Sequence, residues 1–279
     1  MKFAMCNELC QPPELARSCR LAADAGYDGL EIAPFTLAES VLDIGPSQRD
    51  EIRRTAADHG LEIVGLHWLL ASPEGMHLNS PDPRVRQSTV DYLRAEIDLC
   101  ADLGGRTLVF GSPRQRNVLD GQDRQEVWER TAAAFRHLGA RAEARSVVLC
   151  VEPLGASETN FIRTAAEARS FIEAVDSPAV KLVLDVKAMC EDEEPIPDIV
   201  RRSARWLEHF HANDGNRQGP GFGDTDFAPI AGALREIGYD GWVSVEVFDL
   251  SAGPETIAPE SLRYLKHSFD TARNGQGEN

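Results

Sequence analysis

The sequence lacks the features that mark several classes of protein. Its first residues, MKFAMCNELC, contain no apolar core long enough for a signal peptide, and no later run reaches membrane-spanning length. Basic residues are scarce as well, because 29 Lys and Arg stand against 45 Asp and Glu, a formal net charge of −16. Such a surface repels a phosphate backbone or an anionic bilayer. We therefore expect a cytoplasmic protein with no nucleic-acid or membrane partner.

Paired cysteines and linkers are also missing. The six cysteines, at positions 6, 10, 19, 100, 150 and 190, include no C-x-x-C pair, and several stand in apolar runs. We expect them to be free thiols that act as small core residues, not disulfides or zinc ligands. No Pro/Ser-rich linker divides the 279 residues. This predicts one domain over residues 1–272 and a frayed tail at 273–279.

Short apolar runs that alternate with helical stretches are what the sequence does contain. The runs are 2–6, 28–33, 61–67, 106–111, 146–153, 180–186, 207–212 and 241–248. Several of these runs are separated by stretches whose apolar residues recur at helical spacing and which end on a glycine. This alternation is typical of βαβ units and a parallel sheet buried on both faces, and eight strands are enough to close a barrel. The predicted fold class is α/β, a single-domain (β/α)₈ TIM barrel, with an open doubly wound sheet as the alternative.

Carboxylates stand at or near the ends of three predicted buried strands. Glu152 follows LCV, Asp185 ends LVLD and Glu246 follows VSV, while HFHAND adds His211 on the seventh strand. A buried ionised carboxylate is costly unless it is paired or binds a metal. In a barrel these strand ends meet at the C-terminal face.

Taken singly, each residue has an ordinary structural role. Glu152 would be a strand-end group and Asp185 a helix cap. His211 would be a core histidine, and Glu246 would form a salt bridge. Four successive strands with such residues instead predict a site for one divalent metal. The oxygen-rich set with one nitrogen suits Mn²⁺, with Mg²⁺ or Co²⁺ as alternatives.

The segments VEPLGASETN, LVLDVKAM, HFHANDGNRQGPGFGD and WVSVEVF resemble the metal-binding strands of the xylose isomerase-like TIM barrel family, and more narrowly the D-tagatose/D-psicose 3-epimerase group. The resemblance is specific from about Val147 onward. It implies that Glu152 and Glu246 are metal ligands that also act as the catalytic acid/base pair. Asp185 and His211 would be plain ligands.

The same resemblance places Glu158 and Arg217 where those enzymes bind the sugar. The implied activity is that of a divalent-metal-dependent sugar isomerase or epimerase of the ketose 3-epimerase type. It would remove a proton next to a carbonyl and pass through an enediolate. The implied partner is a small sugar or keto-sugar substrate, and the implied assembly is a homodimer or homotetramer.

One position departs from the 3-epimerase pattern. A histidine that grips the substrate in that group corresponds to Ala188 here, and Lys187 stands beside it. Lys187 is therefore a candidate to bind a substrate oxygen or to protonate a leaving group. Alternatively, it is a solvated cation that balances the acidic run 191–194. The lysine keeps open a second activity, a lyase or dehydratase on a keto-sugar, cyclitol or 3-keto-glycoside.

Further candidates carry weaker signals. His67 and Trp68 end the third predicted strand, where they would line a sugar pocket or pack at the barrel rim. Glu31 ends the second strand, and a salt bridge is favoured for it. The glycine-rich run 219–224 is interpreted as a flexible pocket wall, because it lacks a phosphate-binding fingerprint.

Two other functional classes compete with an enzyme acting on sugars. A DNA-repair endonuclease of the same superfold is disfavoured by the seven histidines and the net charge. A non-catalytic metal-binding protein remains an alternative.

Overall fold

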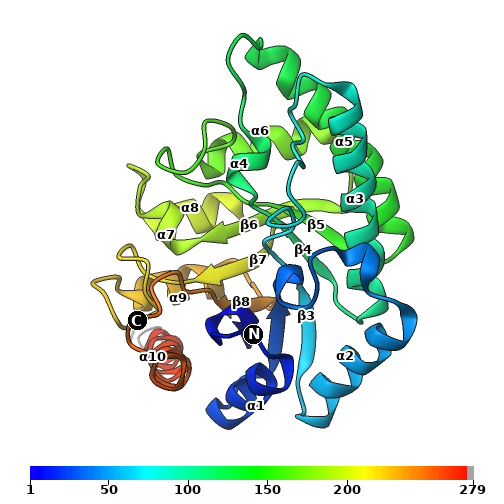
Figure 1. The fold of residues 1–279 in the computed structure, drawn as a ribbon. Coiled ribbons are helices and arrows are strands. Elements are labelled where there is room, and N and C mark those ends of the chain that lie inside the picture. The colour runs from blue at the N-terminus through cyan, green and yellow to red at the C-terminus, as the bar shows by residue number, and fades with distance from the viewer. Residues whose placement is uncertain (275–279) are drawn as a thin grey trace.

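A closed barrel of eight parallel strands, in the order β1 to β8, forms the centre of the protein (Figure 1). The computed structural model describes residues 1–274. The strands are β1 (Lys2–Cys6), β2 (Gly29–Ile32), β3 (Glu62–Leu66), β4 (Thr107–Phe110), β5 (Val148–Val151), β6 (Val180–Asp185), β7 (Leu207–Ala212) and β8 (Trp242–Val245). Closure between β1 and β8 confirms the predicted single TIM barrel and excludes the open sheet.

Helices surround the barrel on its outer side (Figure 1). They are α1 (Leu15–Ala25), α2 (Pro46–Asp58), α3 (Pro83–Asp102), α4 (Pro113–Arg116), α5 (Arg124–Ala144), α6 (Ala165–Val175), α7 (Val186–Met189), α8 (Ile196–Ser203), α9 (Phe227–Glu236) and α10 (Pro254–Asn274), with short 3₁₀ turns η1 (Asn7–Leu9), η2 (Pro34–Thr36) and η3 (Val41–Asp43). Helix α10 runs two residues into the predicted tail at 273–279, and 275–279 lie outside the described residues.

Local chemistry explains where these elements begin and end. Asp82, Asp123 and Asp226 accept hydrogen bonds from backbone N–H groups in the first turns of α3, α5 and α9. Gly26 ends α1 in the left-handed region, at a φ of 90°, where a side chain would be strained. Strands β5 and β8 end before the apolar runs that predict them, because the chain leaves the barrel at Glu152 and Glu246 to build the loops of the C-terminal face.

Strand register decides which side chains share a level of the barrel. A register shift between Leu182 and Val183 brings Asp185 beside His211, and the next pair places His211 beside Ser244. Gly65 has no room for a side chain, since a Cβ there would overlap the backbone of Thr107 on the neighbouring strand. Polar residues from neighbouring strands therefore meet at one depth near the C-terminal end.

The cysteines are all free thiols, as predicted. Five are buried, but Cys190 is exposed because it follows α7 on a loop and not on a strand or the inner side of a helix. Within residues 1–274, no helix is both long and apolar enough to cross a membrane.

Helix α3 carries an uncompensated buried acid. Glu96 is fully buried, on a helix whose Leu93, Ile97 and Cys100 are also buried. Neither carboxylate oxygen has a hydrogen-bond partner among the described residues. Burial accordingly raises the pKa of Glu96 well above its usual range.

We predict that Glu96→Met raises the free energy of unfolding by about 1–3 kcal/mol at pH 8, because it removes an unpaired polar group from the core. A carboxyl with a raised pKa in the folded state contributes most stability below its unfolded pKa and loses it as the pH rises. The gain should therefore shrink between pH 8 and pH 5. Urea denaturation at both pH values measures it, with the exposed Glu51→Met as control. A destabilised Glu96→Met protein at pH 8 would contradict the prediction.

Candidate active site and metal centre

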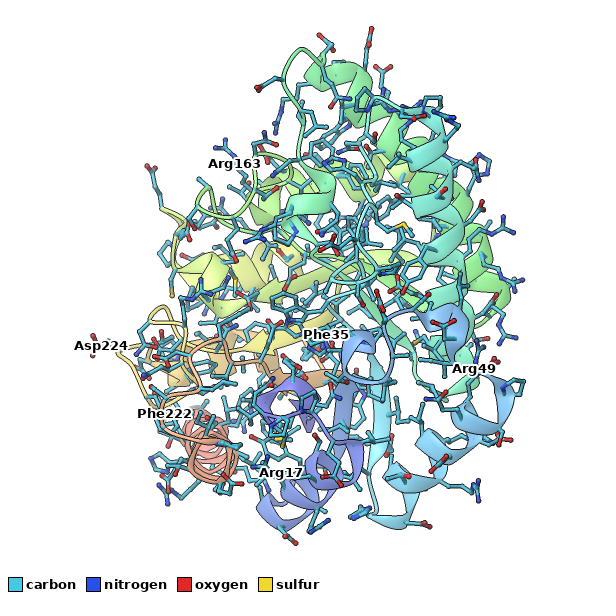
Figure 2. The ribbon with its side chains drawn as sticks, viewed as in Figure 1. Arg17, Phe35, Arg49, Arg163, Phe222 and Asp224 are labelled. Carbon is cyan, nitrogen blue, oxygen red and sulfur yellow. The ribbon has the colours of Figure 1, made fainter. Side chains whose placement is uncertain are left out.

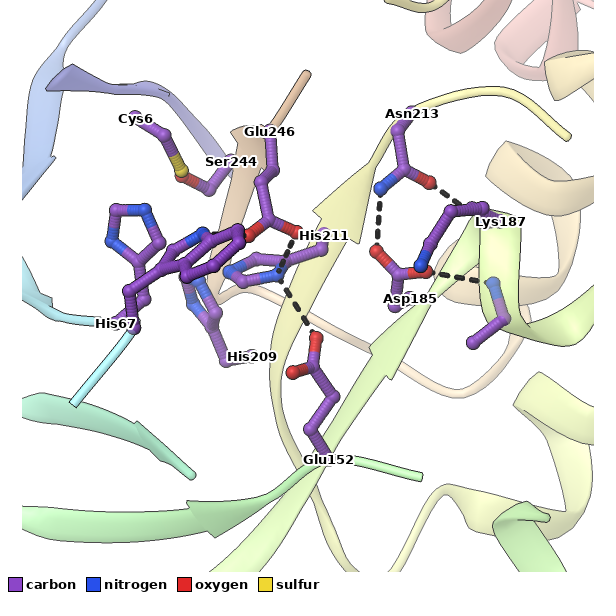
Figure 3. A network of polar contacts seen from close by, with 12 residues as sticks. Cys6, His67, Glu152, Asp185, Lys187, His209, His211, Asn213, Ser244 and Glu246 are labelled. Atoms are coloured by element: carbon purple, nitrogen blue, oxygen red, sulfur yellow. Dashed lines mark hydrogen bonds and ion pairs between the residues drawn. The ribbon is translucent and has the colours of Figure 1, made fainter. Parts of the chain in front are cut away.

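Four successive strands bring their polar ends together at one point of the barrel face (Figure 3). Glu152 directly follows β5, Asp185 ends β6, His211 is the penultimate residue of β7, and Glu246 directly follows β8. All four side chains are buried, and one potential ligand atom of each lies within 4.8 Å of the others. The structure thus assembles the four predicted metal ligands.

The charges of this cluster suit a divalent cation. Nδ1 of His211 lies 3.3 Å from a Glu152 oxygen and 3.1 Å from a Glu246 oxygen, yet it makes no hydrogen bond within residues 1–274. Burial and the charge of Glu152 raise the pKa of Asp185 to about 7, although Lys187 opposes the shift. Three buried carboxylates around one imidazole nitrogen repel one another, and a divalent ion would offset that repulsion. The residues present therefore fit an oxygen-preferring metal.

A buried carboxylate on the opposite side of His211 holds the imidazole in place. Glu31 on β2 accepts hydrogen bonds from Nε2 of His209 at 2.9 Å and of His211 at 3.2 Å. Burial alone would raise the pKa of Glu31, but the two histidines hold it well below its usual range. Because Nε2 of His211 is engaged, Nδ1 is the nitrogen that faces Glu152 and Glu246. The ion pair favoured for Glu31 is therefore present.

Asp185 is oriented by residues that directly follow β6 and β7. One carboxylate oxygen accepts the backbone N–H of Ala188 at 2.7 Å, which caps α7. The other accepts the side-chain amide of Asn213 at 2.5 Å, and Asn213 also accepts the backbone N–H of Lys187 at 2.7 Å. These bonds hold the carboxylate in one orientation toward the cluster (Figure 3).

The loop after β4 supports Glu152. Gly111 leaves room for the Glu152 carboxylate, which a Cβ at that position would overlap. Arg116 at the end of α4 is fully buried, and its guanidinium donates to the carbonyl oxygens of Glu152 at 2.6 Å, Ile162 at 3.1 Å and Phe110 at 3.3 Å. Burial lowers the pKa of Arg116 to about 10, so the side chain stays positively charged at neutral pH.

A cavity of about 470 Å³ opens above the cluster. Its lining includes both Glu152 and Glu246, and it includes every residue predicted to bind substrate: His67, Trp68, Glu158, Lys187 and Arg217. Phe248, two residues after Glu246, also lines the cavity. The volume lies in the range of small-molecule sites.

Lys187 forms a buried ion pair in this cavity. Its ammonium lies 2.5 Å from a carboxylate oxygen of Glu158 and 4.5 Å from the centre of the Phe248 ring. The guanidinium of Arg217 lies over the same ring at 5.2 Å. Burial would lower the pKa of Lys187, but Asp185 and Glu158 raise it above its ordinary value. The expectation of a solvated loop cation is therefore wrong.

His67 is buried with a carboxylate partner that the strand pattern does not single out. Its Nε2 donates to Glu8 at 2.9 Å, and Glu8 lies in η1 directly after β1. Burial would lower the pKa of His67, but the charge of Glu8 raises it to about 9. Sequence reasoning also misses Arg116 and Gly111. Both residues lie in the loop region after β4. That position alone is weak evidence for a functional role, because every loop at this face of a barrel follows a strand.

The glycine-rich run 219–224 does not line this cavity, which corrects the expectation of a pocket wall. Phe222 lies next to α10 (Figure 2), and Pro220, Gly221 and Phe222 form a separate surface depression with Tyr264. A Cβ on Gly221 would contact the Tyr264 ring, so close packing on α10 accounts for this glycine.

Comparison with known families and proteins agrees with the barrel fold. Residues 19–268 match the family model described as xylose isomerase-like TIM barrel. The D-psicose 3-epimerase of Ruminiclostridium cellulolyticum is 33% identical over 230 residues, which cover 81% of this chain and 75% of the relative. The 2-epi-5-epi-valiolone 7-phosphate 2-epimerase of an Actinoplanes species is 30% identical over 222 residues, which cover 79% and 73%.

A solved structure extends the similarity to the whole fold. The crystal structure of D-psicose 3-epimerase with D-tagatose from Clostridium cellulolyticum H10 superposes with a TM-score of 0.82 at 25% identity. The superposition covers 96% of this chain and 99% of the other.

We predict that Arg116→Met lowers the free energy of unfolding by about 1–3 kcal/mol, because buried carbonyl oxygens lose a charged donor. Urea denaturation of the purified protein measures the change. Arg163→Met, which alters an exposed arginine in the loop before α6, is the matched control (Figure 2). A loss no larger than that of the control would contradict the anchoring role of Arg116.

Proposed function

Because this chain belongs to the xylose isomerase-like TIM barrel family, we propose that it is a divalent-metal-dependent ketose 3-epimerase. The observation that carries the proposal is the pair of buried carboxylates, Glu152 and Glu246, on either side of Nδ1 of His211 at the base of the cavity. The named activities of the relatives, which include D-psicose 3-epimerases and an L-ribulose 3-epimerase, support the same reaction class.

Glu152, Asp185, His211 and Glu246 would hold the metal. The proposed ion is Mn²⁺, with Mg²⁺ and Co²⁺ compatible with the same donor set. When bound, the ion supplies positive charge that stabilises negative charge developing on the oxygens of a keto-sugar.

Two opposed carboxylates are what an epimerisation needs. One of Glu152 and Glu246 removes the proton from the carbon next to the carbonyl, which leaves an enediolate. The other returns a proton to the opposite face of the same carbon, so the configuration inverts. The backbone of Glu152 is held by Arg116, and Glu246 directly follows β8, so both carboxylates start from fixed positions at strand ends.

The remaining cavity residues would hold the sugar. At one point of the cavity wall, Glu158 offers a hydrogen-bond acceptor and Lys187 a donor. Arg217 adds a second positive charge, which lies over the Phe248 ring. Lys187 takes the place of the histidine that the 3-epimerase pattern has at Ala188, since its longer side chain reaches the cavity from one residue earlier. His67 and Trp68 would contact the sugar from β3.

The ion pair of Lys187 also bears on the alternative lyase activity. An ammonium held 2.5 Å from Glu158, with its pKa raised by that partner and by Asp185, is poorly suited to give a proton to a leaving group. The pair therefore favours a substrate-holding role for Lys187, and we do not propose elimination.

We predict that the purified protein binds about one divalent ion per chain, since the four ligand types form one cluster. Chelation should abolish activity and lower the Tm, because the ion binds only the folded chain. Elemental analysis measures the content. The double variant Asp185→Ala/His211→Ala should lose the ion, whereas Cys6→Ser, which alters two other groups of potential ligands, should keep it. Stoichiometric binding by the double variant would refute the site.

We further predict that Glu152→Gln and Glu246→Gln each lower kcat by about 10²-fold or more, because glutamine cannot accept the substrate proton. NMR of D-psicose incubated with the Mn²⁺-loaded protein in D₂O measures both turnover and deuterium uptake. One variant should retain exchange from a single face, because only one of the two bases is removed. Glu62→Gln at the other end of the barrel is the control. Undiminished turnover by Glu246→Gln would exclude the mechanism.

A further inference from the structure

Trp68 makes a contact that distinguishes it from the other residues of the cavity wall. Its indole Nε1 donates a hydrogen bond to Oε1 of Glu246 at 3.1 Å, although the two residues lie on β3 and β8 loops far apart in the sequence. The side chain is 41% exposed, so hydrophobic burial alone does not explain its position. The indole therefore lies where it touches both the cavity and a carboxylate of the proposed acid/base pair.

The two oxygens of Glu246 have different neighbours. Oε1 accepts from the Trp68 indole, whereas Oε2 lies 3.1 Å from Nδ1 of His211. An indole N–H only donates, so it can neither take up the substrate proton nor bind a metal. It can hold one oxygen of Glu246 in place and leave the other facing the ligand cluster, as a neighbour that orients a metal ligand does.

The backbone at Trp68 is arranged to make this contact. Its φ is 55°, in the left-handed region, which is uncommon for a residue with a large side chain. The residues that follow Trp68 anchor this turn. Leu69 and Leu70 are buried, and the backbone N–H of Leu70 donates a hydrogen bond to the hydroxyl of Ser112 at 3.3 Å. Strained conformations of this kind persist where the surroundings determine them, and they cluster at functional sites.

Two aromatic rings hold the indole from either side. Phe35 after β2 packs edge-on against it at 6.1 Å between ring centres, and Phe248 after β8 packs at 6.3 Å with a tilt of 50°. With its ring held and its backbone turn anchored, Trp68 has little freedom to leave Glu246.

We propose that Trp68 is a positioning residue, which fixes the Glu246 carboxylate through the indole N–H so that it faces both the metal and the substrate carbon. This deepens the proposed epimerase function and rests on it for the catalytic part. The competing role is a plain wall that contacts the sugar. A wall needs the ring alone, whereas positioning needs the N–H group.

Trp68→Phe separates the two roles, because phenylalanine keeps an aromatic ring and loses the donor. Mn²⁺ affinity, measured by calorimetry without sugar, should weaken about tenfold. With D-psicose as substrate and saturating Mn²⁺, kcat should fall about tenfold while KM changes less than about threefold. Trp206→Phe is the matched control, since Trp206 precedes β7 at the other end of the barrel and its ring contacts Arg169 and Arg205.

Unchanged Mn²⁺ affinity in Trp68→Phe, or a loss confined to KM, would overturn the positioning role. The calorimetric result does not depend on turnover, so a protein inactive on D-psicose would count against the proposed function and leave the Trp68 test intact. A spectroscopic measurement covers the case in which Trp68→Phe does not fold. Among the four indole N–H resonances of the ¹⁵N-tryptophan-labelled protein, one should shift in Glu246→Gln, because the acceptor loses its charge. No shift in any of them would also overturn the proposal.

Discussion

Repulsion among buried carboxylates is the constraint on which the rest of this site depends. Glu152, Asp185 and Glu246 meet at the end of the barrel, and burial together with the charge of Glu152 raises the pKa of Asp185 to about 7. One free nitrogen of His211 cannot neutralise three acids. A divalent cation held by these residues would offset that repulsion, which is the physical basis of the metal site that we propose.

The surrounding residues each limit the freedom of one member of that cluster. Glu31 holds the far nitrogen of His211, Asn213 holds Asp185, and Trp68 holds Glu246, each through a hydrogen bond of 3.2 Å or less. These partners come from β2 and from the loops after β7 and β3, so the site is oriented from several sides of the barrel. Rigid side chains matter here because proton transfer and metal binding both tolerate little displacement.

The cavity wall contains a buried ion pair. The Lys187 ammonium pairs with Glu158, because the lysine side chain is long enough to reach that carboxylate from the start of α7. The pairing also explains why a lysine is tolerated in a cavity so close to Asp185.

The sequence by itself was enough to determine the barrel and the four strand-end ligand candidates. Strands buried on both faces require continuous apolar runs, and in a closed parallel barrel their polar ends must converge, so Glu152, Asp185 and Glu246 could be found from local pattern. The hydrogen-bond partners of these residues follow from the three-dimensional arrangement of the loops. The pairing of Glu8 with His67, of Arg116 with the Glu152 carbonyl and of Trp68 with Glu246 joins loops from different strands. Such contacts depend on register and loop path, which no local spacing of residues encodes.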